Sequence, residues 1–289
     1  MAIETIAAAT AQTSPSPGPI MQSAAYAKYL RGLRHRTCIV QTWQIGLVAL
    51  LLGVWEIAPR AGWINPMLTS YPSAVAKTLL VMLQDGSLVL HTWTTLIEIM
   101  IGFCGGMALG LVGAVALWSS PFLYRVLDPF IVVLNGIPKI ALVPIFYIWL
   151  GDTASIYAMA IAVSVFVTII MLHTGFDAVD ADKIKLVRLF GASHRQILWK
   201  IVLPASVPTM VSTLKVNVGL ALVGVIVGEF QAAKAGLGYL ITYGSQIFKM
   251  NLVMAAIVIL AVISSVLFIA IQALETIVLR RSGSLRSSD

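Results

Sequence analysis

Long apolar segments separated by shorter polar ones dominate the chain. Each is long enough to cross a bilayer, because about 20 apolar residues in a helix span the hydrocarbon core. The third contains Pro138 and Pro144, so we expect it to be kinked or broken where protein or a water-filled cavity covers its backbone. The pattern predicts an all-α integral membrane protein with about six transmembrane helices, at residues 38–58, 95–117, 130–150, 155–174, 208–230 and 252–279.

A basic, amphipathic segment interrupts this pattern within the connection 175–207, between the fourth and fifth spans. It reads DKIKLVRLFGASHRQILWKIVLP from Asp182 to Pro204. Asp180 is a good cap for a helix that runs through Phe190, and Gly191 can close that helix in a left-handed conformation.

A second short helix should follow this glycine corner. Ser193, with Gln196 three residues later, forms the sequence of a capping box, and Pro204 is expected to end the helix. The two helices therefore flank a fixed corner at Gly191.

Both short helices should have apolar faces bordered by basic residues. Such faces suit insertion into a groove on a soluble partner, although an amphipathic helix can also lie on anionic lipid. The fixed corner favours the groove, because a helix on a lipid surface gains nothing from it. The apolar residues are Ile184, Leu186, Val187 and Phe190 in the first helix and Ile197, Leu198, Ile201 and Val202 in the second.

The Lys and Arg residues are distributed unequally between the two sides of the membrane. One set of loops holds only four, Arg60, Lys77, Lys234 and Lys249. Basic loops stay in the cytoplasm, so both termini and the connection 175–207 are predicted to be cytoplasmic. The cytoplasmic set of thirteen is Lys28, Arg31, Arg34, Arg36, Arg125, Lys183, Lys185, Arg188, Arg195, Lys200, Arg280, Arg281 and Arg286.

Composition agrees with a membrane protein, since 59% of the residues are hydrophobic and only 11% are charged. The net charge of +7 is explained by cytoplasmic loops and needs no nucleic acid. We expect residues 1–37 to form a disordered, basic cytoplasmic tail, residues 38–279 the transmembrane domain, and residues 280–289 a second cytoplasmic tail.

Sequence motifs of common enzymes and metal sites are absent. The chain contains no GxxxxGK[ST], HExxH, CxxC or GxSxG, and Cys38 and Cys104 follow no disulfide or metal-binding pattern. We therefore expect no catalytic residues, no metal site and no cofactor in this chain.

Small residues recur every four positions in two of the spans. Such ridges allow helices to approach closely, within the subunit or, as the alternative, between subunits. The predicted packing positions are Gly102, Gly106, Gly110, Gly224 and Gly228.

Polar residues inside spans are costly and usually face a cavity or a partner. Four are candidates for a transport pathway: Lys139, Lys215, Asn217 and Glu229. Lys139 can instead contact a neighbouring loop, Lys215 can extend to the cytoplasmic headgroups, and Glu229 can make a structural hydrogen bond.

The sequence after the first cytoplasmic helix is similar to a known motif, G-A-S-x-x-x-I-x-x-x-V/I-x-L-P. It resembles the cytoplasmic "EAA" loop of permease subunits in binding-protein-dependent ABC importers, although Lys185-Leu186-Val187 replaces Glu-Ala-Ala. That replacement puts in doubt any salt bridge made by the glutamate. The matching residues are Gly191, Ala192, Ser193, Ile197, Ile201, Leu203 and Pro204.

Three further segments, 72–80, 128–151 and 227–241, look like the nitrate, sulfonate and taurine branch of this family. The resemblance implies the type I ABC importer permease fold in a bacterial inner membrane. It also implies a second copy of the permease as partner, two ATP-binding subunits that hold the ATP and magnesium, and an extracytoplasmic solute-binding protein. The ATP-binding subunits would contact Lys185, Leu186, Val187, Phe190, Gly191, Ala192, Ser193, Ile197, Leu203 and Pro204.

The leading hypothesis for function is thus an ABC importer permease for a small solute. The resemblance favours an anion such as a sulfonate, taurine, nitrate or bicarbonate, with an uncharged heterocyclic vitamin precursor as the alternative. A secondary transporter driven by an ion gradient is the competing class. It predicts inverted repeats and a carboxylate near the midplane, and neither is evident in the sequence.

Overall fold

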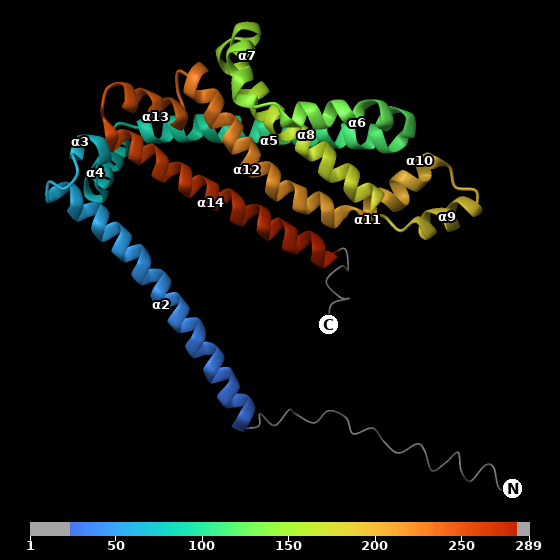
Figure 1. Cartoon of the computed structure of the whole chain (residues 1–289), viewed down its shortest axis with the longest axis horizontal. Coiled ribbons are helices and arrows are strands. Elements are labelled where there is room, and N and C mark those ends of the chain that lie inside the picture. Colours follow the sequence, from blue (N-terminus) through green and yellow to red (C-terminus); the bar gives the residue numbers. More distant parts are fainter. Residues whose placement is uncertain (1–23, 282–289) are drawn as a thin grey trace. The chain divides into compact units, whose positions relative to one another are not determined.

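The computed structural model describes residues 24–281, and every element in this range is helical (Figure 1). Helix α2 up to Ala58 is a unit of its own, separate from the unit that begins at Pro59. The elements are α2 (Ala24–Arg60), α3 (Pro66–Thr69), α4 (Pro72–Gln84), α5 (Ser87–Ser119), α6 (Pro121–Gly136), η1 (Lys139–Leu142), α7 (Val143–Leu150), α8 (Asp152–Asp177), α9 (Ala181–Leu189), α10 (His194–Ile197), η2 (Leu198–Val202), α11 (Leu203–Ala205), α12 (Val207–Ala232), α13 (Leu237–Gln246) and α14 (Met250–Arg281).

The predicted membrane spans correspond to helices of the structure. Within residues 24–281, five segments are long and apolar enough to cross a bilayer, and a bent helix pair makes up to six. The helices extend beyond the predicted limits, as in α5, which begins at Ser87 rather than at residue 95. The five are Ile39–Arg60, Ser87–Ser119, Asp152–Asp177, Val207–Ala232 and Met250–Leu279.

The third predicted span is broken rather than merely kinked. Helix α6 and the segment Lys139–Leu150 meet at an angle of 89°. Ile137 and Pro138 between them are extended, and Pro138 supplies no backbone N–H to continue the helix. Pro144 causes no kink, because it lies in the first turn of α7, where a missing N–H has no cost.

Part of the segment predicted to be a disordered tail is helical. Helix α2 begins at Ala24, so residues 24–37 are helical. The proline-rich sequence ends at Pro19, and the following residues, with several Ala, Leu, Lys and Arg, favour a helix. The predicted tail segments 1–23 and 282–289 lie outside the described residues.

The core of the larger unit is a bundle in which α8 packs along both α5 and α12 (Figure 1). Its buried side chains include Ile99, Ile156, Met159 and Leu172. Helix α14 packs against α12, α13 and α4. The connection 175–207 leaves α8 and returns into α12, so the bundle determines where that connection lies.

Glycines bring the three core helices into close contact. On α5, Gly102, Gly106 and Gly110 are buried, and a Cβ at each would collide with Ala160, Ser164 or Thr168 of α8. From the other side, a Cβ added at Gly224 of α12 would lie 2.6 Å from Cα of Ala160, and one at Gly228 would lie 3.0 Å from Cα of Ile156. All five glycines predicted from the sequence therefore face α8 within one subunit.

We expect Gly224→Ala to lower the thermal unfolding midpoint of the purified protein. The new methyl group would meet the backbone of Ala160, and overpacking of this kind typically costs about 1–3 kcal/mol. Gly219→Ala in the same helix is the control, since no atom lies within 4 Å of the position of its Cβ. Equal midpoints for the two variants would contradict the close approach of α12 and α8.

Candidate functional site

A buried hydrogen bond joins the two ends of the connection 175–207. Ser206, just before α12, is buried, and its hydroxyl donates a hydrogen bond to the carbonyl oxygen of Gly175 in α8 at 3.2 Å. The connection therefore leaves and re-enters the bundle at adjacent positions. Its intervening helices, α9 to α11, form one projection at an end of the bundle (Figure 1).

The corner at Gly191 has the geometry predicted from the sequence. Asp180 caps α9 by accepting a hydrogen bond from the amide of Asp182 at 2.9 Å. Gly191 has a φ of +82°, a left-handed conformation that glycine adopts without strain. The amide of Ala192 then donates to the carbonyl of Val187, which closes the end of the helix.

The second helix begins with the predicted capping box. The amide of Ser193 donates to Gln196 Oε1 at 2.8 Å, and the amide of Gln196 donates to Ser193 Oγ at 3.3 Å. These reciprocal hydrogen bonds satisfy two amides at the start of α10. The direction of the chain after the glycine corner is therefore fixed by local contacts.

Pro204 does not end the helix, contrary to the prediction. A π-helical turn, η2, precedes it, and the helical path continues through α11 to Ala205. A π turn shifts the hydrogen bonds by one residue, and the amide of Leu203 donates to the carbonyl of Leu198. This wider turn accommodates the proline ring, which would clash with the preceding turn of a regular α-helix.

The apolar face of the second helix is buried inside the chain. Ile197, Leu198 and Val202 form a cluster with Leu172 and Phe176 of α8 and with Ala114 of α5. His194 stacks on Trp118 of α5 with ring centroids 4.6 Å apart. This face therefore holds the connection to the bundle, and Ile197 is corrected from a predicted docking residue to an anchoring residue.

The apolar residues at the tip of α9 are exposed instead. The exposed fraction is 55% for Leu186, 85% for Leu189 and 82% for Phe190. Leu189 is absent from the predicted docking residues, although its position three residues after Leu186 places both on one helix face. We call Leu186, Leu189 and Phe190 the α9 tip.

The remaining predicted docking residues fall into two groups. Beside the α9 tip, Gly191 and Ser193 are exposed, Val187 and Ala192 are half-buried, and Lys185 pairs with Asp182 at 3.0 Å. Leu203 and Pro204 lie instead at the base of the connection, where they border an apolar groove of about 720 Å³ next to α5. The predicted residues therefore do not form one continuous surface.

Two of the predicted pathway residues have partners inside the subunit. Lys215 of α12 forms an ion pair with Glu275 of α14. Asn217 is buried, and its Nδ2 donates to Thr168 Oγ1 at 2.6 Å. These contacts hold α12 to α14 and α8.

Lys139 lies at the break between α6 and α7. Its Nζ donates to the carbonyl oxygen of Asn135 and lies 5.9 Å from the ring centroid of Phe166 in α8. It borders a largely apolar cavity of about 470 Å³ between α6, α7 and α8. This position at a cavity keeps Lys139 a candidate for a transport pathway.

Glu229, near the C-terminal end of α12, connects this helix to α5 and α13 by hydrogen bonds. It is buried and accepts hydrogen bonds from Thr95 Oγ1 of α5 at 2.7 Å and from the amide of Gly238 in the first turn of α13. Gly236 has a φ of +115°, and a Cβ there would collide with the Glu229 carboxylate. The amide of Leu237 donates in turn to Thr95 Oγ1 at 2.8 Å. The structural hydrogen bond considered for Glu229 is thus present, whereas the part played by Thr95 was not evident from the sequence.

We expect Lys215→Met to lower the thermal unfolding midpoint, because it leaves Glu275 without its partner among apolar helices. Removing one member of a buried pair costs about 3–5 kcal/mol, and partial exposure of this pair reduces the expected loss to about 1–2 kcal/mol. Lys215→Met combined with Glu275→Gln should recover most of the loss.

Lys234→Met is the matched control, since Lys234 pairs with Asp152 at the surface with 86% of its side chain exposed. A loss as large for this control as for Lys215→Met would contradict a specific contribution from the ion pair with Glu275.

Comparison with known proteins identifies the family of the chain. Residues 102–283 match the family described as "Binding-protein-dependent transport system inner membrane component". The taurine transport system permease protein TauC of Escherichia coli (strain K12) is 28% identical over 241 residues, which cover 81% of this chain and 87% of that protein. The formylaminopyrimidine transport permease protein ThiX of Halalkalibacterium halodurans is 29% identical over 231 residues, covering 80% of this chain and 92% of that protein.

A solved structure supports the fold independently of sequence. A chain of the MetNI methionine ABC transporter in an inward-facing conformation superposes with a TM-score of 0.59 at 20% identity, covering 68% of this chain and 97% of that chain. The family match, the relatives and the fold agree on one assignment. The chain belongs to the binding-protein-dependent family of inner membrane components, and it is a non-catalytic, multi-pass permease subunit of an ABC importer.

Proposed function

We propose that the α9 tip is the surface through which this permease contacts its ATPase subunits, and that the imported solute is a small organic anion of the sulfonate class. The observation that carries the contact is the exposure of Leu186, Leu189 and Phe190, three adjacent large apolar side chains at the end of α9. Adjacent exposed apolar residues of this size are typical of an interaction site. ATP and its magnesium ion would bind to the ATPase subunits, and a second permease copy would complete the membrane domain.

The surroundings of the α9 tip suit a groove on a soluble partner. Lys183, Lys185 and Arg188 are exposed on α9, so the apolar residues have a basic rim. An amphipathic helix typically inserts its apolar side chains into such a groove while charged residues at the edge set its orientation. The capped corner at Gly191 presents α9 at a fixed angle, which reduces the entropy lost on binding.

The buried side of the connection provides a route for coupling. Ile197, Leu198 and Val202 are packed against α5 and α8, so a displacement of α9 is transmitted to the membrane helices through side-chain contacts. An ATPase pair that contacts α9 differently in its closed and open states would then shift the permease between inward- and outward-facing conformations. ATP hydrolysis on the ATPase subunits would thus drive a change in the positions of the membrane helices.

The substrate class rests on relatives and on charge. TauC is named for taurine, an aminosulfonate, and inside the spans the chain places the cationic side chains Lys139 and Lys215. Because Lys215 is paired with Glu275, only Lys139 supports an anion directly. An uncharged heterocycle is the second candidate, favoured by the similarity to ThiX, which is named for formylaminopyrimidine.

We expect Leu186→Ser combined with Leu189→Ser to weaken retention of the ATPase subunit at least tenfold when the complex is purified from its native membrane. Loss of two apolar anchors at an interface typically costs more than the roughly 1.4 kcal/mol that corresponds to a factor of ten. The matched control is Leu80→Ser combined with Leu83→Ser in α4, where the exposed fractions are 60% and 56%. Unchanged retention in the α9 variant would overturn the assignment of the contact surface.

We expect cells lacking this gene to lose uptake of radiolabelled taurine or of a short alkanesulfonate, and the restored gene to recover it. The measurement is initial uptake at low external concentration, with labelled formylaminopyrimidine as the parallel substrate. Loss of pyrimidine uptake with intact sulfonate uptake would show that the transported solute is the heterocycle and not the sulfonate. Neither result would affect the ATPase contact, which the purification experiment tests separately.

A further inference from the structure

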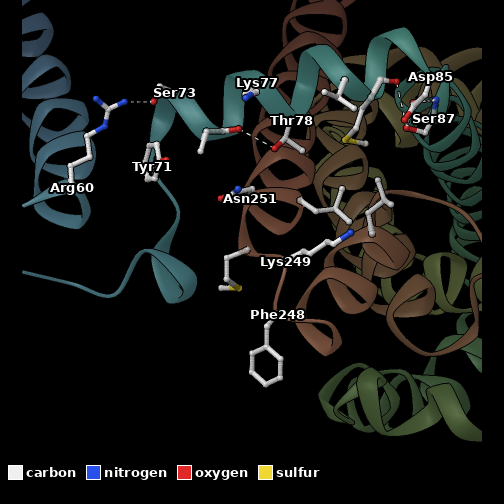
Figure 2. Close-up of a pocket in the computed structure, with 16 residues that line it drawn as sticks. Arg60, Tyr71, Ser73, Lys77, Thr78, Asp85, Ser87, Phe248, Lys249 and Asn251 are labelled. Carbon is white, nitrogen blue, oxygen red and sulfur yellow. Dashed lines mark hydrogen bonds between the residues drawn. The ribbon is translucent and has the colours of Figure 1, made fainter. Parts of the chain in front are cut away.

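A cavity of about 870 Å³ opens between α4 and the segment that joins α13 to α14 (Figure 2). Three cationic residues from three separate segments contribute to its lining. They are Arg60 at the end of α2, Lys77 in α4 and Lys249 immediately before α14. These are three of the four basic residues that the charge distribution assigns to the outward side of the membrane.

Two of these residues lie at the boundary of the hydrocarbon core. Arg60 is the last residue of the span Ile39–Arg60, and Lys249 directly precedes the span Met250–Leu279. The ends of apolar spans mark the level at which lipid headgroups begin. The cavity is therefore at headgroup depth.

The cationic charge of the cavity is only partly balanced within the chain. Lys77 and Lys249 are exposed, and among the described residues neither has an ion-pair partner within 4 Å. Arg60 is held in place, since its guanidinium donates to Ser73 Oγ at 2.7 Å and lies 5.2 Å from the ring centroid of Tyr71. Lys77 and Lys249 are thus available to an anion that enters between α4 and α14 beside the Arg60 guanidinium.

One carboxylate, Asp85, also lines the cavity, but it already accepts hydrogen bonds from Ser87. It accepts hydrogen bonds from the amide of Ser87 at 2.9 Å and from the hydroxyl of Ser87 at 2.6 Å. These hydrogen bonds lower the pKa of Asp85, so it stays ionised at neutral pH. Asp85 alone therefore cannot neutralise both Lys77 and Lys249, and the cavity keeps positive charge.

Exposed apolar side chains occur at the same level. Phe248 is 69% exposed and Val81 is 51% exposed, and both line the cavity. Trp63, 77% exposed, and Met67, 65% exposed, follow the end of α2. Aromatic residues are enriched where the acyl chains meet the headgroups, so this combination suits a lipid better than a water-soluble anion.

We propose that Arg60, Lys77 and Lys249 form a binding site for the headgroup of an anionic phospholipid of the outer leaflet. The phosphate lies among the three cations, and the glycerol and upper acyl carbons contact Phe248 and Val81. Clusters of basic residues at the membrane surface attract anionic lipid with about 1 kcal/mol for each Lys or Arg. An acidic loop of the solute-binding protein is the competing occupant, although it would approach from water and would not require a site at headgroup depth.

The test measures lipid retention by the purified full-length permease. The protein is placed in nanodiscs of phosphatidylcholine that contain a minority of phosphatidylglycerol, extracted gently, and its bound lipid is identified by mass spectrometry. We expect several-fold enrichment of phosphatidylglycerol for the wild type and bulk composition for Lys77→Gln combined with Lys249→Gln. Lys77→Arg combined with Lys249→Arg should keep the enrichment, because charge is conserved.

The control is Lys234→Gln, which removes an outward lysine that pairs with Asp152 and does not line this cavity. It should leave the enrichment unchanged. All variants should unfold at the wild-type midpoint in phosphatidylcholine alone, because the substituted side chains are exposed. Enrichment that persists in the double glutamine variant would overturn the site, and displacement of the lipid by solute-loaded binding protein would assign the site to that protein.

Discussion

The close approach of α5, α8 and α12 is the constraint on which the rest of the structure depends. Lipid provides no hydrophobic force between helices, so their association relies on packing and on hydrogen bonds across the interface. The glycines of α5 and α12 allow backbone contact with α8 on two of its sides. Within that contact, Asn217 reaches Thr168, a hydrogen bond that helices held further apart could not make.

Both ends of this bundle carry segments that are attached to it by side chains. At the end predicted to be cytoplasmic, the apolar cluster around Val202 and the hydrogen bond between Ser206 and Gly175 fix the connection 175–207. On the outward side, Glu229 and Thr95 fix the start of α13. A change in the relative positions of α5, α8 and α12 must therefore move segments on both surfaces, which is what alternating access requires of a permease.

The sequence predicted those features that depend on neighbouring residues. The spans follow from uninterrupted apolar runs, and the caps at Asp180 and Ser193 and the left-handed Gly191 follow from patterns a few residues long. The break at Pro138 was predicted for the same reason, because a missing amide acts within one turn.

Features that depend on distant partners were not predicted. The position of Lys215 does not reveal Glu275, which belongs to another helix, and the apolar face of Ile197 has the same pattern whether it meets α8 or another protein. The continuation of the helix past Pro204 depends on a π turn, for which the sequence carries no recognised signal. Periodicity shows that a face is apolar, whereas only the tertiary structure shows what covers it.

The cytoplasmic connection divides its apolar residues into a buried set and an exposed set. Ile197, Leu198 and Val202 stabilise the chain, while Leu186, Leu189 and Phe190 contribute little to its internal packing. Substitutions in the exposed set therefore change the surface offered to a partner without a large cost in stability. Selection can thus alter the choice of partner in such a permease while the membrane domain itself is conserved, because the two properties reside in different side chains of one short segment.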